Sequence, residues 1–198
     1  MGQGSNMIRL IIILTAISLV AAVALAKVYD ITKVRIAEQE RIKTMNGLKA
    51  VLPQFNNDVE KDAREVIVGQ DKKGRDVKIK FYTGKMDEKP VGVAFEMIAR
   101  DGYAGDIDIL MGVSPEGKVS GIEIIHDTET PGLGKKISQD KWKEEFKGRS
   151  LEEGPKFAVK KDGGVIDQFS GATISPRAVV SAVKKGLELY KKEFSNGG

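Results

Sequence analysis

Residues 10–26 form an uncharged apolar run in which Thr15 and Ser18 are the most polar side chains. A run of this length lies at the short end of what an α-helix needs to cross a bilayer. Because it is apolar on all faces and lies near the start of the sequence, a buried core helix is the least favoured interpretation. Arg9 before the run and the small residues 24–26 at its end also fit a cleaved signal peptide.

The segment after the run, residues 27–53, is charged but compatible with a helix, and it has no proline before Pro53. This pattern favours one helix that leaves the bilayer and continues as a stalk, because proline disfavours helix in the residue before it. We therefore expect an N-terminal segment at residues 1–9, a transmembrane helix at 10–26, a helical stalk at 27–53 and one domain at 54–198.

The charges on either side of the apolar run bear on its orientation. Lys27, Lys33, Arg35 and Arg41 follow the run, whereas Arg9 precedes it. By this count of charges, the positive-inside rule places the domain in the cytoplasm. Large domains can nevertheless be exported despite such charges.

The composition limits the chemistry that the domain can carry. The sequence has no cysteine and one histidine, which excludes disulfides, cysteine nucleophiles, iron–sulfur clusters and thiolate metal sites. Any redox chemistry must then come from an organic cofactor. The net charge of +4 is spread over 32 basic and 28 acidic residues without a long basic block, so nucleic-acid binding has little support.

The pattern of residues 54–198 predicts one α+β domain, with an antiparallel or mixed sheet and flanking helices. β-branched residues on both sides of a turn at 71–74 predict a strand pair, and further strands are expected at 91–99, 107–113 and 119–125. A glycine turn at 101–105 separates two of them, and the 114–117 turn suits type I.

Two helices are expected after the last strand. In the first, Ser138 is the predicted N-cap, Ile137 and Trp142 form a hydrophobic staple, and Gly148 ends the helix. In the second, Ser175 caps a helix that Pro176 opens. Spacings of three and four residues place five side chains of this helix in the core: Val180, Val183, Leu187, Tyr190 and Phe194.

A glycine-rich loop at residues 126–136 is a candidate ligand-binding segment. It lacks the residues of a Walker A loop and the third glycine of a dinucleotide fingerprint. Its backbone amides can approach a flat ligand, with Leu133 packing on the ligand face and Thr130 or Glu129 offering polar contacts. A purely structural Ω-type loop explains the same spacing equally well.

A second loop, residues 167–177, leads into the last helix. Gly171 and Ala172 would let the backbone approach a ligand closely, and the free N–H groups of a helix N-terminus suit a phosphate. From these residues alone, a plain helix cap at Ser175 is the simpler interpretation.

The other chemistry-bearing residues favour structural roles. His126 is better explained as a hydrogen-bonding residue at a strand end, and Asp106 and Asp108 as part of a solvated strand face. The sequence shows no metal-ligand spacing and no convincing catalytic triad, so neither a metal site nor a catalytic residue is predicted.

Two motifs in the same order carry a resemblance to a known family: "GYAGDIDILMGVSPEGKVSGIEIIHDTETPGLG" and "DQFSGATIS". With the apolar N-terminal run, they make the chain similar to the G subunits of Rnf-type ion-translocating electron-transport complexes. These belong to the FMN-binding domain family that is shared with the C subunit of the Na+-translocating NADH:quinone oxidoreductase.

The resemblance implies that FMN is attached to Thr173 through a phosphoester bond, with Ser170, Gly171 and Ala172 shaping the turn. Asp167 and Ser175 match flanking positions that a flavin transferase reads, an enzyme that uses FAD and a magnesium ion. The loop that would contact the isoalloxazine ring consists of Glu129, Thr130, Pro131, Gly132, Leu133 and Gly134.

The resemblance also implies a function within a membrane complex. Electrons would pass through this protein while the complex moves them between reduced ferredoxin and NAD, coupled to Na+ or H+ transport. The expected partners are the other subunits, the flavin transferase and membrane lipid, and the flavin domain would lie on the extracytoplasmic side, against the charge count. Two alternatives stay open: the quinone-reductase C subunit, and a membrane-tethered scaffold domain without flavin.

Overall fold

The computed structural model describes residues 3–70 and 74–194. The chain divides into two compact units, Met1–Lys43 and Thr44–Gly198. The helix α1 (Gln3–Val51) forms the described part of the first unit, and its last turns belong to the second. The predicted stalk thus contributes residues to the folded domain, and α1 ends two residues before Pro53.

In the first unit, the side chains of residues 6–43 are all exposed. This part of α1 contains a window of mean hydropathy 2.6, which is apolar enough to cross a membrane by length and composition. The hydroxyl of Thr15 donates to the carbonyl of Ile11 at 2.9 Å, so its polar group is satisfied within the helix. Such internal bonding is what a helix surrounded by lipid requires.

The second unit is built on a five-stranded antiparallel sheet whose order follows the chain. The strands are β1 (Arg64–Gln70), β2 (Asp76–Met86), β3 (Lys89–Ala99), β4 (Ile107–Val113) and β5 (Val119–His126). The predicted strand pair, third strand and hairpin are confirmed, although residues 71–73 of the first predicted turn lie outside the described residues. In the β4–β5 turn, Gly117 N–H donates to Ser114 O at 2.9 Å, as in the predicted type I turn.

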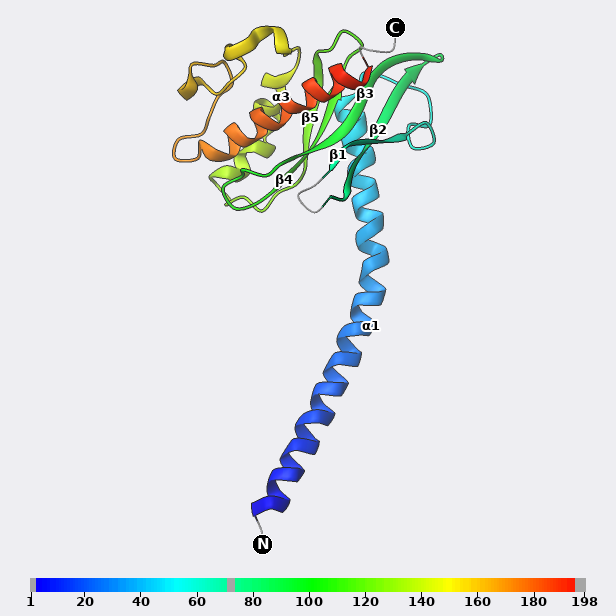
Figure 1. Ribbon diagram of the computed structural model, residues 1–198, viewed down its shortest axis with the longest axis vertical. Coiled ribbons are helices and arrows are strands. Elements are labelled where there is room, and N and C mark those ends of the chain that lie inside the picture. Colours follow the sequence, from blue (N-terminus) through cyan, green and yellow to red (C-terminus); the bar gives the residue numbers. More distant parts are fainter. Residues whose placement is uncertain (1–2, 71–73, 195–198) are drawn as a thin grey trace. The chain divides into compact units, whose positions relative to one another are not determined.

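The helix α3 (Ile174–Phe194) covers one face of this sheet, as Figure 1 shows. Its predicted core side chains are confirmed: Val180, Val183, Leu187 and Tyr190 are buried, and Phe194 packs against the same cluster. The helix approaches β4 so closely that a Cβ at Gly186 would lie 2.2 Å from the sulfur of Met111. The α+β class predicted from the sequence is therefore confirmed.

The last turns of α1 cover part of the opposite face, where Leu48 and Val51, together with Leu52 directly after the helix, join a second apolar cluster. The sheet is lined there by glycine, and a Cβ at Gly112 would lie 2.2 Å from the Val51 carbonyl oxygen. Side chains at Gly112 would thus push the helix end off the sheet.

Short helices connect β5 to α3: η1 (Gly134–Ser138), α2 (Asp140–Lys143), η2 (Glu144–Phe146), η3 (Leu151–Lys156) and η4 (Lys160–Asp162). The prediction that Ser138 is the N-cap is wrong, because Ser138 is the last residue of η1 and the extended residue Gln139 precedes α2. Ile137 and Trp142 are both buried in the core, and their packing fixes this path more strongly than a cap would. Gly148, with φ of +76°, follows η2 directly after its C-cap residue, Lys147.

Candidate functional site

The two loops singled out in the sequence meet at one cavity of about 120 Å³. A third segment, the glycine turn between β3 and β4, also reaches it. The residues that line the cavity are Tyr103, Glu129, Leu133, Gly134, Gly171, Ala172, Thr173, Ile174 and Ser175. Segments that lie far apart in the chain, from Tyr103 to Ser175, thus form one site.

The first wall is a tight turn that begins at Thr130. The carbonyl of Thr130 accepts hydrogen bonds from the N–H groups of Leu133 at 3.1 Å and Lys135 at 3.2 Å. Gly132 has φ of +78°, and the proline before it suits the second position of a type II turn. This turn leaves Leu133 on the cavity with 44% of its surface exposed.

The Asp127 side chain stabilises this turn. Its carboxylate accepts the N–H of Glu129 at 3.1 Å and forms an ion pair of 2.8 Å with Lys135, while its side chain is only 3% exposed. Both ends of the turn are therefore held by one acidic side chain that the sequence patterns did not single out.

The second wall is the turn before α3. Ala172 N–H donates to Phe169 O at 3.0 Å, and Gly171 has φ of +75°, which favours glycine. Thr173 directly precedes α3, and its carbonyl accepts the N–H of Arg177 at 3.2 Å. Thr173 therefore stands at the N-cap position, where a helix offers unpaired N–H groups and the positive end of its dipole.

The prediction that Ser175 caps this helix is wrong. Ser175 lies inside the first turn of α3, and its hydroxyl donates to Glu129 Oε2 at 2.8 Å. Both side chains are buried, with 1% of Ser175 and 4% of Glu129 exposed. The Ser175 hydroxyl thus bonds to the other loop and does not cap α3. Pro176 lies in the same first turn, where an N–H group would have no partner within the helix.

Comparisons with known proteins identify the domain. A family model described as an FMN-binding domain matches residues 102–188, a range that contains every residue lining the cavity. The G subunit of the ion-translocating oxidoreductase complex of Aliivibrio fischeri strain MJ11 is 40% identical over 182 residues, covering 89% of this chain and 87% of that protein. The protein of the same name from Haemophilus influenzae strain PittEE is 41% identical over 180 residues, covering 88% and 85%.

This chain belongs to the family of these G subunits. The crystal structure of Shewanella oneidensis NqrC also resembles it, with a TM-score of 0.52 and 23% identity over 67% of each chain, and this likeness concerns the fold alone.

The cavity of this G-subunit family member includes most of the predicted site residues and excludes others. Glu129, Leu133, Gly134, Gly171, Ala172, Thr173 and Ser175 line it, whereas Asp167, Ser170, Thr130, Pro131 and Gly132 do not. Asp167 has a different local role: its N–H donates to Glu145 at 2.7 Å, and its carbonyl accepts the indole N–H of Trp142 at 2.7 Å.

Tyr103 and Ile174 line the cavity but were not predicted from the sequence. Tyr103 lies in the glycine turn that the sequence did indicate, and an aromatic residue among glycines was the available signal. Nothing in the sequence placed that turn next to Thr173, since their proximity depends on how β4, β5 and α3 pack.

The wall residues of the cavity suit FMN in their chemistry. Tyr103, Ile174 and Leu133 expose 68%, 46% and 44% of their surfaces, so they offer an apolar rim to a flat ring. The helix N-terminus beside Thr173 suits a phosphate. The volume of about 120 Å³ lies below the range of about 300–1,000 Å³ that is usual for enclosed ligand sites. A flavin ring would therefore rest against the rim and stay partly open to solvent.

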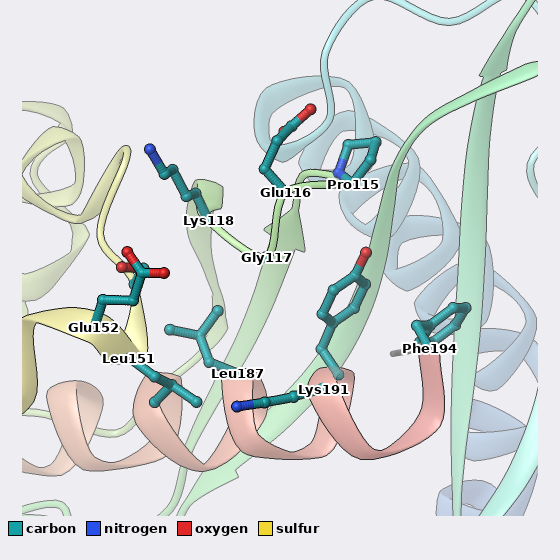
Figure 2. A pocket seen from close by; sticks show the side chains of 11 residues that line it. Pro115, Glu116, Gly117, Lys118, Leu151, Glu152, Leu187, Lys191 and Phe194 are labelled. Carbon is teal, nitrogen blue, oxygen red and sulfur yellow. The ribbon is translucent and has the colours of Figure 1, made fainter. Parts of the chain in front are cut away.

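A larger cavity of about 470 Å³ lies between the β4–β5 turn, η3 and the end of α3 (Figure 2). Its lining carries two basic side chains, Lys118 and Lys191, and two acidic ones, Glu116 and Glu152. This balanced lining attracts neither anions nor cations selectively, and none of the predicted site residues belongs to it. Volume alone thus does not identify the functional site.

Proposed function

We propose that this protein is a membrane-anchored electron-transfer subunit of an ion-translocating oxidoreductase complex, with FMN attached to Thr173 through a phosphoester bond. The observation that carries the proposal is the position of Thr173: it lines the cavity, closely follows the Gly171 turn and directly precedes α3. The names of the G-subunit relatives support the assignment to such a complex.

Under this proposal, each of these residues would have a part in holding the cofactor. The α3 N-terminus would stabilise the phosphoester charge, by about 0.3–1 kcal/mol for a surface site. Gly171, with its positive φ and no side chain, would let the backbone approach the phosphate. Leu133, Tyr103 and Ile174 offer apolar contact to the ring, and the bound FMN supplies the redox chemistry.

Attachment follows from the chemistry of the hydroxyl. A flavin transferase with FAD and Mg²⁺ would join Thr173 Oγ1 to the FMN phosphorus, break the phosphoanhydride bond of FAD, and release AMP and the hydroxyl proton. Thr173 is half-buried, so part of its surface remains accessible to the transferase.

The wider assignment follows the G-subunit relatives. Residues 10–26 cross the membrane once, residues 27–53 form the stalk whose last turns pack on the sheet, and residues 54–198 hold the FMN on the extracytoplasmic side. The complex would exchange electrons between ferredoxin and NAD, coupled to Na+ or H+ transport, and the partners would be its other subunits and membrane lipid. A quinone-reductase C subunit has weaker support, since the NqrC likeness rests on 23% identity.

The attachment is tested by expressing the full chain with its flavin transferase and measuring the intact mass. We expect an added mass of one FMN less one water, and in-gel flavin fluorescence after denaturation. Thr173→Ala should lose both, while Thr130→Ala, which changes a threonine of the opposite loop, should keep both. An unmodified wild-type mass, or covalent flavin in the Thr173→Ala variant, would overturn the proposal. The same mass shows whether residues 1–26 are retained.

A further inference from the structure

The Glu129 carboxylate connects all three segments of the cavity. Its Oε2 accepts the Ser175 hydroxyl at 2.8 Å, and its Oε1 accepts the Ala104 N–H at 3.2 Å. Ala104 follows Tyr103, and Ser175 lies two residues after Thr173. One side chain in the first loop is therefore bonded to the backbone beside Tyr103 and to the helix turn beside Thr173.

The packing around this carboxylate leaves it little freedom to move. A Cβ at Gly134 would lie 2.2 Å from Glu129 Oε2, and one at Gly102 would lie 3.0 Å from Oε1. Glycine at both positions lets the backbone close on the carboxylate from two sides. These two oxygen atoms therefore contact residues of all three segments.

Hydrogen bonds from uncharged groups hold the Glu129 carboxylate. Lys135, on the same loop, is paired with Asp127 at 2.8 Å. Among the described residues, a hydroxyl and an N–H group donate hydrogen bonds to the Glu129 carboxylate. A carboxylate accepts at both oxygens and donates at neither, so it matches two donors that approach from opposite sides.

We propose that Glu129 is a positioning residue that fixes the separation between Tyr103 and Thr173, and so holds the FMN ring against Tyr103. This inference rests on the proposed attachment at Thr173. A flavin tethered at one point by its phosphate would otherwise be free to swing away from the rim. The spacing set by Glu129 makes Tyr103 the wall opposite to the tether.

The test is a double-mutant cycle in the full chain loaded with flavin, using Glu129→Ala, Ser175→Ala and both together. Removing a buried hydrogen bond should raise, about fivefold, the population of molecules in which the flavin ring has moved away from Tyr103. This change is the equivalent of about 1 kcal/mol. The readout is quenching of flavin fluorescence by iodide, measured only on the covalently loaded and folded fraction. Because the two side chains act through one bond, the double variant should be little worse than the worse single variant.

Two further variants separate positioning from general stability. Glu129→Gln can still accept from Ala104 and donate to Ser175, so it should lie between wild type and Glu129→Ala. Glu123→Ala removes another partly buried carboxylate, which pairs with Lys143 at 2.6 Å and does not line the cavity. It should leave iodide quenching unchanged even if it lowers stability. Additive effects in the cycle, or equal quenching in all loaded variants, would overturn the inference.

The protein expressed without its flavin transferase provides a readout that does not depend on flavin. In Glu129→Ala, hydrogen exchange at the Ala104 amide should accelerate about fivefold or more, whereas Glu123→Ala should leave it unchanged. A wild-type chain that never acquires flavin would contradict the attachment but not this result. Unchanged exchange at Ala104 would contradict the positioning role even if Thr173 carries FMN.

Discussion

The Ser175 hydroxyl donates a hydrogen bond of 2.8 Å to Glu129 Oε2, and it joins residues 46 positions apart in the chain. The bond links the first turn of α3 to the loop that follows β5. A serine with the sequence context of a helix cap is thus part of the cavity wall, and the start of α3 is tied to the opposite loop.

Substitution of Gly134 should loosen this wall. In Gly134→Ala, the new Cβ would lie 2.2 Å from Glu129 Oε2 and 2.7 Å from Ser175 Oγ, so the bond between them must break or the loop must shift. We expect a loss of about 1–3 kcal/mol in the free energy of unfolding. Urea titration of the full chain in detergent, followed by the fluorescence of the single tryptophan, measures it. Gly69→Ala, where nothing lies within 4 Å of the new Cβ, is the control, and an equal loss there would contradict the prediction.

The contact between α1 and the sheet gives a second stability prediction. Gly112→Ala should cost about 3 kcal/mol or more, because its Cβ would lie 2.2 Å from the Val51 carbonyl oxygen, a backbone atom that cannot rotate away. The same titration measures the effect. Proteolysis should also cut the 44–52 region faster in the variant. A variant with wild-type stability would show that the helix end does not pack on the sheet in solution.

The pH dependence of stability should show the effect of Glu96. Glu96 is exposed on β3, but desolvation of its carboxylate, and then the negative charge of Asp108, raise its pKa, while Lys80 opposes them. The folded state therefore holds this proton more tightly than the unfolded state, and the resulting stability is lost as pH rises through the raised pKa. Glu96→Gln should be more stable than wild type near pH 7, and the difference should vanish near pH 4.

Asp62→Asn is a control for that measurement, because its effect on stability near pH 7 should have the opposite sign. Hydrogen bonds from Lys85 and Asn57 lower the pKa of Asp62, so its ionised form stabilises the fold above its unfolded pKa, and this stability is lost as pH falls. This variant should be less stable than wild type near pH 7 and similar to it in acid. If the stability difference from wild type changed with pH in the same direction for both variants, the assigned directions of the two pKa shifts would be contradicted.

The orientation of the membrane anchor can be tested because the sequence contains no cysteine. A cysteine at the exposed Lys141 should react with a membrane-impermeant maleimide in intact cells. A cysteine at Arg9, before the apolar run, should react only after the cells are permeabilised. The reverse pattern would place the domain in the cytoplasm, as the positive-inside count suggests.

The sequence by itself determined the elements whose signals are local. The apolar run, the alternation of the strands, the glycines of the turns and the spacing of Val183 and Leu187 in α3 depend on neighbours within a few residues. The two loops of the site were also found in this way, because turn chemistry is local as well.

The tertiary structure decided how those loops are used. A helix cap contributes about 1 kcal/mol, and buried contacts can exceed that amount. The packing of Ile137 and Trp142 thus outweighs a cap at Ser138, and the hydrogen bond to Glu129 engages the Ser175 hydroxyl. That Tyr103 and Thr173 line the same cavity depends on the packing of α3 on the sheet. Contacts of this kind join distant residues, and no local pattern in the sequence contains them.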